Sequence, residues 1–226
     1  MPHSWYFPTT LIQDKVARLA PRSVADIGSG FGKWGFLLRE QLDWNLGRVA
    51  KADWTAQIVG VEVFPYESPL HDWVYDELIR EDALNIVERL VGFDLVLLCD
   101  VIEHIEKRVA LSFLRHMVST NRNVIVCTPL DFFEQEISDN EYEHHISHWS
   151  MTDFKEFTYD YDQAGGAAMV VTLAGNGASW PSRRDMAASR LTYTMLGLKR
   201  RSGAARLVKQ VVGRALRTRT AAKSWE

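Results

Sequence analysis

The sequence predicts an α/β fold in which a mainly parallel sheet is covered by helices on both faces. Strand-like apolar runs alternate with helical patterns as far as residue 127, the order that builds such a sheet. A glycine-rich turn directly follows the first strand. The 226 residues, of which 46% are hydrophobic and 24% charged, suit one globular domain with a sizeable core.

Each predicted element follows from local periodicity or from a turn signal. Apolar residues at helical spacing predict helices over 9–20, 33–40 and 110–119, and a Ser-x-x-Asp capping box at Ser150 predicts a short helix over 151–156. Buried strands are predicted over 24–27, 58–63, 93–99 and 123–129. The runs 157–161 and 168–173 flank two glycines and predict a hairpin at an antiparallel end of the sheet.

Three irregular stretches interrupt this alternation, at 43–56, 64–73 and 131–150. Ligands of open α/β sheets bind outside the carboxyl ends of the strands. The second and third stretches follow strand ends, so we expect them to border the substrate.

Charge divides the chain into two parts. Residues 199–226 contain nine basic residues and one acidic residue, a net charge of +8, whereas the rest of the chain carries −11. We expect a globular domain over 1–180 and a basic helical C-terminal extension over 181–226. The acidic body argues against a broad nucleic-acid surface, because phosphate contacts need clustered Lys and Arg.

The extension has an amphipathic pattern over 205–217, with apolar residues on one face and basic residues on the rest. Such a helix suits packing on the body or on a second copy in a homodimer. The alternatives are a peripheral membrane contact, since basic amphipathic helices lie on anionic surfaces, and RNA binding.

Localisation follows from the start of the chain and from its cysteines. The first residues lack the pattern of a secretory signal, and Cys99 and Cys127 lie in apolar strand patterns that suit core positions. We expect a cytoplasmic protein, membrane-peripheral if the extension binds lipid.

The most informative segment is Val24 to Gly32, a short strand that runs through three glycines into a helix. Glycine lets the backbone approach a ligand closely, and a helix start presents free N–H groups. The glycine spacing differs from the G-x-G-x-x-G pattern of dinucleotide-binding folds. The segment predicts either a nucleotide-cofactor cradle or an ordinary glycine-rich turn, and features further along favour the cradle.

With Asp26 ahead of the glycines, the segment resembles motif I of the class I S-adenosylmethionine-dependent methyltransferases. Later motifs of that family follow in order within residues 9–175, including Asp-x-x-Glu-His after the fourth strand and Thr-Pro after the fifth. The resemblance implies a Rossmann-like, seven-stranded mixed sheet that binds S-adenosylmethionine. Glu62 would accept hydrogen bonds from the ribose diol, and Asp82 would meet the adenine amino group. The implied cofactor-binding residues are Asp26, Gly28, Ser29, Gly30, Gly32, Glu62, Val63, Asp82, Ala83, Asp100 and Val101.

Three of the seven histidines lie within residues 144–148, just after the fifth strand. A substrate hydroxyl could meet the methyl group there, and a neutral imidazole with an ordinary pKa near 6.5 can act as its general base. His145 is the first candidate, with His144 and His148 behind it, and His104 is a further catalytic candidate. The alternative is a solvated loop that is rich in histidine.

A divalent metal site is a second interpretation of the same residues. Asp100, Glu103 and His104 have i, i+3 and i+4 spacing, so one helical turn would bring them to one face, and His145 could complete the set. The arrangement is similar to that of the plant-type small-RNA 2′-O-methyltransferases, in which a cation binds both hydroxyls of a ribose diol. For this chain the resemblance implies Mg²⁺ or Mn²⁺. The alternative is that the Glu-His pair shapes the cofactor pocket without a metal.

A sugar hydroxyl needs a base or a cation before it can be methylated, so these residues favour an O-methyltransferase. The combination of motifs resembles bacterial methyltransferases of glycan assembly, which implies a saccharide or oligosaccharide acceptor, or another small molecule with a hydroxyl. The alternatives are an RNA 2′-O-methyltransferase and, outside enzymes, a regulatory or scaffold subunit that only binds the cofactor.

Overall fold

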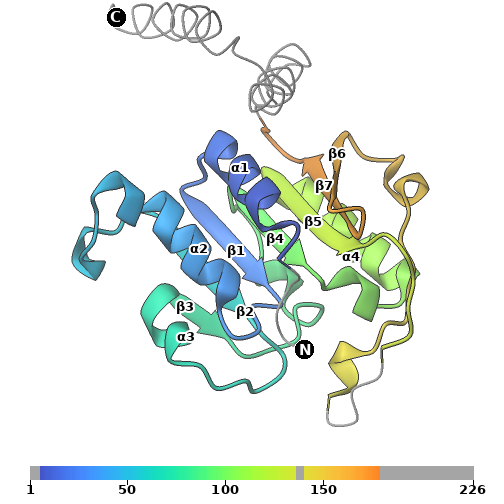
Figure 1. Ribbon diagram of the computed structural model, residues 1–226, viewed down its shortest axis with the longest axis horizontal. Helices are drawn as coiled ribbons and strands as arrows, with labels where there is room; N and C mark the ends of the chain where they lie inside the picture. The colour runs from blue at the N-terminus through green and yellow to red at the C-terminus, as the bar shows by residue number, and fades with distance from the viewer. Residues whose placement is uncertain (1–5, 136–139, 179–226) are drawn as a thin grey trace, which may run out of the picture. The chain divides into compact units, whose positions relative to one another are not determined.

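The computed structural model describes residues 6–135 and 140–178, in which a seven-stranded sheet carries helices on both faces (Figure 1). The strand order is β3-β2-β1-β4-β5-β7-β6. Neighbours from β3 to β5 run parallel, whereas β7 runs antiparallel to both β5 and β6. The strands are β1 (Ser23–Ile27), β2 (Gln57–Val61), β3 (Glu77–Ile79), β4 (Leu95–Cys99), β5 (Asn123–Pro129), β6 (Tyr159–Ala164) and β7 (Ala168–Ala174). The predicted Rossmann-like mixed sheet is confirmed.

The α-helices are α1 (Thr9–Leu19), α2 (Lys33–Leu42), α3 (Pro69–Val74) and α4 (Lys107–Thr120). Short 3-10 turns are η1 (Trp44–Leu46), η2 (Lys51–Asp53), η3 (Val87–Arg89), η4 (Ile102–His104), η5 (Glu141–Glu143) and η6 (Met151–Phe154). The helix predicted over 151–156 is therefore the single turn η6. Its capping box is present, since the Ser150 N–H donates to the Asp153 carboxylate at 2.7 Å.

Two hydrophobic layers follow from the alternation of side chains along the strands. Val24 and Ile58 face one layer, into which α1 and α2 send Ile12 and Leu38. Their neighbours in sequence face the other layer, where α4 supplies Ala110, Phe113, Leu114 and Met117. Because the central strands are buried on both faces, they are apolar almost throughout, as a parallel sheet requires.

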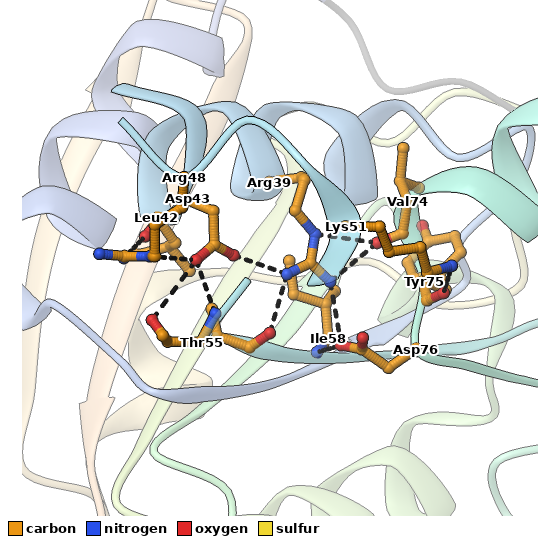
Figure 2. Close-up of polar contacts among 11 residues, drawn as sticks. Arg39, Leu42, Asp43, Arg48, Lys51, Thr55, Ile58, Val74, Tyr75 and Asp76 are labelled. Atoms are coloured by element: carbon orange, nitrogen blue, oxygen red, sulfur yellow. Dashed lines mark hydrogen bonds and ion pairs between the residues drawn. The ribbon is translucent and has the colours of Figure 1, made fainter. Parts of the chain in front are cut away.

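A fully buried arginine fastens the 43–56 stretch to the sheet (Figure 2). Arg39 of α2 donates to Asp43 at 2.6 Å, to Asp76 at 2.9 Å and to the carbonyl oxygens of Ala56 and Val74 at 2.8 and 3.0 Å. Its guanidinium also lies 4.1 Å from the centre of the Trp54 ring. One side chain therefore joins α2, the end of the 43–56 stretch, the last residue of α3 and Asp76 after it.

Asp43 is the other buried charge of this cluster. Burial disfavours its charged form, but hydrogen bonds from Thr55, Arg48 and Arg39 hold its pKa below the ordinary value. The Arg48 Nε–Asp43 distance is 2.7 Å, and the Thr55 N–H donates to the same carboxylate oxygen at 2.9 Å. The irregular stretch is thus ordered by charge pairing around a polar centre.

The predicted extension over 181–226, with its possible dimer, membrane and RNA contacts, lies outside the described residues. Among the helices that are described, none is both long and apolar enough to cross a membrane. Cys99 and Cys127 are buried free thiols at paired positions of β4 and β5.

Candidate active site

A cavity of about 460 Å³ lies at the carboxyl ends of the central strands. Its volume is within the range of about 300–1,000 Å³ that is typical of small-molecule sites. The walls come from the segments after β1, β2, β3 and β4 and from the 131–150 stretch after β5. Both irregular stretches expected beside the substrate contribute to it, 64–73 through Tyr66 and 131–150 through His145 among others.

The glycine turn after β1 forms the floor of this cavity. The N–H groups of Gly28 and Ser29 donate to the Val61 carbonyl at 2.9 and 3.1 Å, which ties the turn to β2. Gly28 has a φ of +73°, and a Cβ at this position would lie 2.6 Å from Cγ2 of Val101. Only glycine fits here without displacing the segment after β4, so the turn is a close backbone approach of the kind a ligand cradle needs.

Glu62 lies beside the turn at the end of β2. Its side chain accepts hydrogen bonds from the N–H groups of Gly30 and Phe64 at 2.7 and 3.0 Å. Burial raises its pKa, and these two hydrogen bonds oppose the rise. Asp82, after β3, is held in a tight turn by accepting from the Leu84 N–H at 2.9 Å. Both carboxyl groups line the cavity.

Most of the other predicted cofactor-binding residues also line the cavity: Gly28, Ser29, Gly30, Val63, Ala83, Asp100 and Val101. Asp26 and Gly32 do not. Gly32 has a φ of +91° and is the residue from which α2 starts, so its role is in the path of the chain. Asp26 lies beneath the turn, buried, and accepts a hydrogen bond from the Tyr75 hydroxyl at 2.5 Å.

The Asp26 environment explains a glycine inside α2. A Cβ at Gly35 would lie 2.6 Å from the Tyr75 hydroxyl oxygen. Glycine at this position of α2 therefore leaves room for the Tyr75 ring to reach Asp26. Burial raises the pKa of Asp26 to about 7, the charge of Glu62 adds to the rise, and the Tyr75 hydrogen bond opposes it. Asp26 is thus a buried partner of Tyr75 and not part of the cavity lining.

Replacing Asp26 with asparagine should change how stability depends on pH. Between the ordinary value of 3.8 and about 7, the folded protein keeps a proton on Asp26 that the unfolded chain releases. The free energy of unfolding of the wild type should therefore fall as pH rises, by up to about 1.4 kcal/mol per pH unit from this group. Asp26→Asn should not show this fall in the free energy of unfolding. Urea denaturation at roughly pH 4 to 8, which spans the two pKa values, measures it. The exposed Asp53→Asn should follow the wild type, and an Asp26→Asn curve parallel to the wild type would contradict the assignment.

The segment after β4 differs from its prediction. Asp100 has a φ of +54° and the residues that follow form the 3-10 turn η4, so no α-helical turn aligns Asp100 with Glu103 and His104. The left-handed backbone at Asp100 redirects the chain before α4 starts at Lys107. Spacing alone could not indicate this, because i, i+3 and i+4 neighbours meet only in a continuous helix.

Three of the four predicted metal ligands nevertheless come together. Glu103, His104 and His145 offer ligand atoms that all lie within 4.8 Å of one another, and Asp100 is not a member of this group. Glu103 is buried. Its Oε2 accepts from the Thr128 hydroxyl at 3.0 Å, and its Oε1 has no hydrogen-bond partner among the described residues. Burial, together with the charge of Asp100, raises the pKa of Glu103 well above its ordinary value.

Hydrogen bonds fix how the two imidazoles are presented. The Nδ1 atoms of His104 and His145 lie 3.0 Å from the carbonyl oxygens of His144 and Phe133 respectively. A carbonyl only accepts, so each Nδ1 carries the proton and each Nε2 presents a lone pair. Burial lowers the pKa of both rings. Neutral rings with a free Nε2 suit either proton abstraction or coordination of a cation.

The other two candidate histidines lie outside the main cavity. His144 contributes its carbonyl oxygen to His104, and the His148 ring lies 3.1 Å from the Leu130 carbonyl oxygen. Neither lines the cavity, whereas His104 and His145 both do.

Sequence patterns did not indicate Tyr66, Gln135, Asn140 and Glu143, which also line the cavity. They come from irregular stretches that have no periodicity. The position of 64–73 and 131–150 directly after strands was the available signal.

Comparison with known proteins supports the fold. No family model matches the sequence, and no curated protein matches it. Solved structures do match. The methyltransferase domain of bacterial CtHen1 superposes with a TM-score of 0.53 at 16% identity, covering 76% of this chain and 98% of that one. The N-terminal domain of EvdMO1, solved with SAH bound, gives a TM-score of 0.50 at 12% identity, covering 76% and 83%.

The chain has the class I methyltransferase fold. At 12–16% identity the similarity concerns the fold alone. Within this methyltransferase fold, the cavity lies where the parallel strands end, as is general for open α/β sheets.

Proposed function

We propose that this protein is an S-adenosylmethionine-dependent O-methyltransferase that acts on a hydroxyl group of a saccharide. The observation that carries the proposal is the juxtaposition, in one cavity, of a glycine cradle with a buried carboxyl group and two half-buried imidazoles. The cradle suits a nucleoside cofactor, and the second group suits activation of a hydroxyl.

The cradle fits the cofactor by shape and by chemistry. Gly28 leaves the backbone bare where a Cβ would meet Val101, and Glu62 places a buried carboxyl group at the end of β2, within reach of a ribose diol. Asp82 lines the cavity on the next loop and would meet the adenine. S-adenosylmethionine supplies an activated methyl group on its sulfonium, so the protein has only to align the acceptor and exclude water.

The acceptor hydroxyl needs help to lose its proton. One possibility is that His145 Nε2 accepts that proton directly, as a neutral imidazole can near neutral pH. The other is that Glu103, His104 and His145 hold Mg²⁺ or Mn²⁺, which would polarise the hydroxyl when bound. The Oε1 of Glu103 lies buried beside two imidazoles and has no hydrogen-bond partner within 6–135 and 140–178. This supports the second possibility, because a buried carboxyl oxygen without a partner is costly.

The cavity lining favours an uncharged acceptor. Its carboxyl side chains are Glu62, Glu81, Asp82, Asp100, Glu103, Glu106 and Glu143, whereas Lys33 is the one Lys or Arg among the described lining residues. Such a wall repels phosphates. Phe133 and Tyr142 line the cavity and are 37% and 46% exposed, so they offer aromatic surface for the apolar face of a sugar ring.

RNA 2′-O-methylation is the second candidate. The grouping of Glu103, His104 and His145 favours it, because these residues match the pattern of the small-RNA 2′-O-methyltransferases. Transfer of a labelled methyl group to neutral oligosaccharides and to short RNAs separates the two. Turnover on RNA alone would replace the saccharide proposal, and binding of the cofactor without turnover on any hydroxyl would favour a regulatory subunit.

Replacing Glu62 with alanine should weaken binding of S-adenosylmethionine by roughly 1–3 kcal/mol, because charge-assisted hydrogen bonds to the ribose are lost. Calorimetry measures the change. Glu77→Ala is the matched control. Glu77 lies on edge strand β3, and its carboxylate forms an exposed ion pair with Arg89. Equal affinities of Glu62→Ala and the wild type would show that Glu62 does not hold the ribose.

A further inference from the structure

The cofactor side of the cavity and its histidine side are physically linked through Tyr66. Tyr66 lies four residues after Glu62, in the loop that follows β2. Its hydroxyl donates to Glu143 Oε1 at 2.9 Å and accepts from Asn140 Nδ2 at 2.6 Å. These partners are more than 70 residues away in the chain and belong to the loop after β5.

Residues 140–147, here called the bridging segment, carry His145 and are fastened at three places. Tyr66 holds the start. Gln135 holds the middle, because its side chain donates to the Glu143 carbonyl at 2.9 Å and its carbonyl accepts from the His145 N–H at 3.2 Å. The end is held by the Glu103 carbonyl, which accepts from the N–H groups of Ile146 and Ser147 at 2.9 and 3.0 Å.

The position of Tyr66 is in turn tied to Glu62. The Phe64 N–H donates to Glu62 Oε1, and the Tyr66 N–H donates to the Phe64 carbonyl at 2.8 Å. The Tyr66 ring also packs against the rings of Phe31 and Phe64, at centroid distances of 5.1 and 4.7 Å. A short chain of contacts therefore runs from the carboxyl group assigned to the ribose to the segment that presents His145.

We propose that Tyr66 is a positioning residue that couples occupancy of the cofactor site to the placement of His145. The inference rests on the proposed function for the identity of the cofactor. Binding at Glu62 orders the loop after β2, and the Tyr66 hydroxyl passes that order to the bridging segment. Cofactor binding would thus stabilise the arrangement of the bridging segment that the structure describes, which favours binding of the cofactor before the acceptor.

Hydrogen exchange of the full chain, with and without S-adenosylhomocysteine, tests the coupling without requiring turnover. In the wild type, the ligand should slow exchange both at the glycine turn, residues 28–32, and in the bridging segment. In Tyr66→Phe, protection of the turn should remain, whereas exchange in the bridging segment with ligand bound should be about tenfold faster than in the wild type. Tyr159→Phe is the matched control, because it removes a phenol hydroxyl from β6, outside the cavity lining, and should behave as the wild type.

The outcomes separate this inference from the proposed function. Absence of protection at 28–32 in the wild type would overturn the cofactor assignment and the coupling that rests on it. Protection of the turn with no ligand effect on the bridging segment, or with the same effect in Tyr66→Phe, would overturn the coupling alone. Glu143→Ala removes the acceptor of the same hydrogen bond and should reproduce Tyr66→Phe. Glu143→Gln keeps an acceptor and should retain the protection, with thermal unfolding used to verify that each variant is folded.

Discussion

Replacing His145 with alanine should lower kcat for methyl transfer by roughly 10²- to 10⁴-fold, the usual contribution of a general acid or base. The ring lines the cavity, its Nδ1 proton is held by the Phe133 carbonyl, and its centre lies 5.0 Å from the His104 ring. Cofactor affinity should change little, because the cradle is built from the segments after β1, β2 and β3. Labelled methyl transfer at saturating cofactor measures the loss. His148→Ala is the matched control, since that ring lies outside the cavity.

A chelator distinguishes the two roles of His145. If it is a ligand, chelation should abolish turnover, added Mg²⁺ or Mn²⁺ should restore it, and Glu103→Ala with His145→Ala should be strongly non-additive, because both remove ligands of one ion. If it is a base, the chelator should have no effect. Wild-type rates in His145→Ala would refute both roles.

Replacing Arg39 with alanine should destabilise the protein by about 3–5 kcal/mol, the cost of removing one partner of a buried ion pair. Asp43 would stay fully buried but would lose its 2.6 Å ion pair with the Arg39 guanidinium. The carbonyl groups of Ala56 and Val74 would lose the hydrogen bonds that Arg39 donates. Urea denaturation measures the effect. Arg39→Lys should recover only part of it, because a lysine ammonium cannot reproduce the planar fork of donors.

Arg18→Ala is the matched control for Arg39. Arg18 pairs with Asp14 at 2.9 Å, also with i, i+4 spacing, but both side chains are 30–40% exposed. Its loss should cost less than about 1 kcal/mol. If Arg39→Ala were as mild as this control, the buried cluster of Figure 2 would not be what orders the 43–56 stretch.

Sequence patterns predicted the fold well because its signals are local. Buried parallel strands are continuous apolar runs, and the turn after β1 needs glycine for steric reasons that a sequence displays directly. The burial of Arg39 could not be predicted in the same way. An arginine on an amphipathic helix is expected to be exposed. Its ion pairs with Asp43 and Asp76 form only in the folded chain, so the sequence does not indicate them.

The candidate site was predictable in composition and less so in geometry. Glu103, His104 and His145 were identifiable by residue type and by position after strand ends, and the structure brings them together. The left-handed backbone of Asp100 and the contact of Tyr66 with Glu143 were not identifiable, because neither has a periodic signature. The choice among His144, His145 and His148 also depends on the path of a loop, which sequence spacing does not determine.

The carboxyl-rich lining of the cavity also bears on how a catalytic cycle would end. S-adenosylmethionine has a positive sulfonium that its product, S-adenosylhomocysteine, lacks. If the protein binds this donor as proposed, carboxylates such as Asp100 and Glu143 would attract the charged donor and not the neutral thioether, through a field that weakens as ionic strength rises. The wall would therefore hold the donor more strongly than the spent molecule, so product inhibition should be weakest in dilute salt.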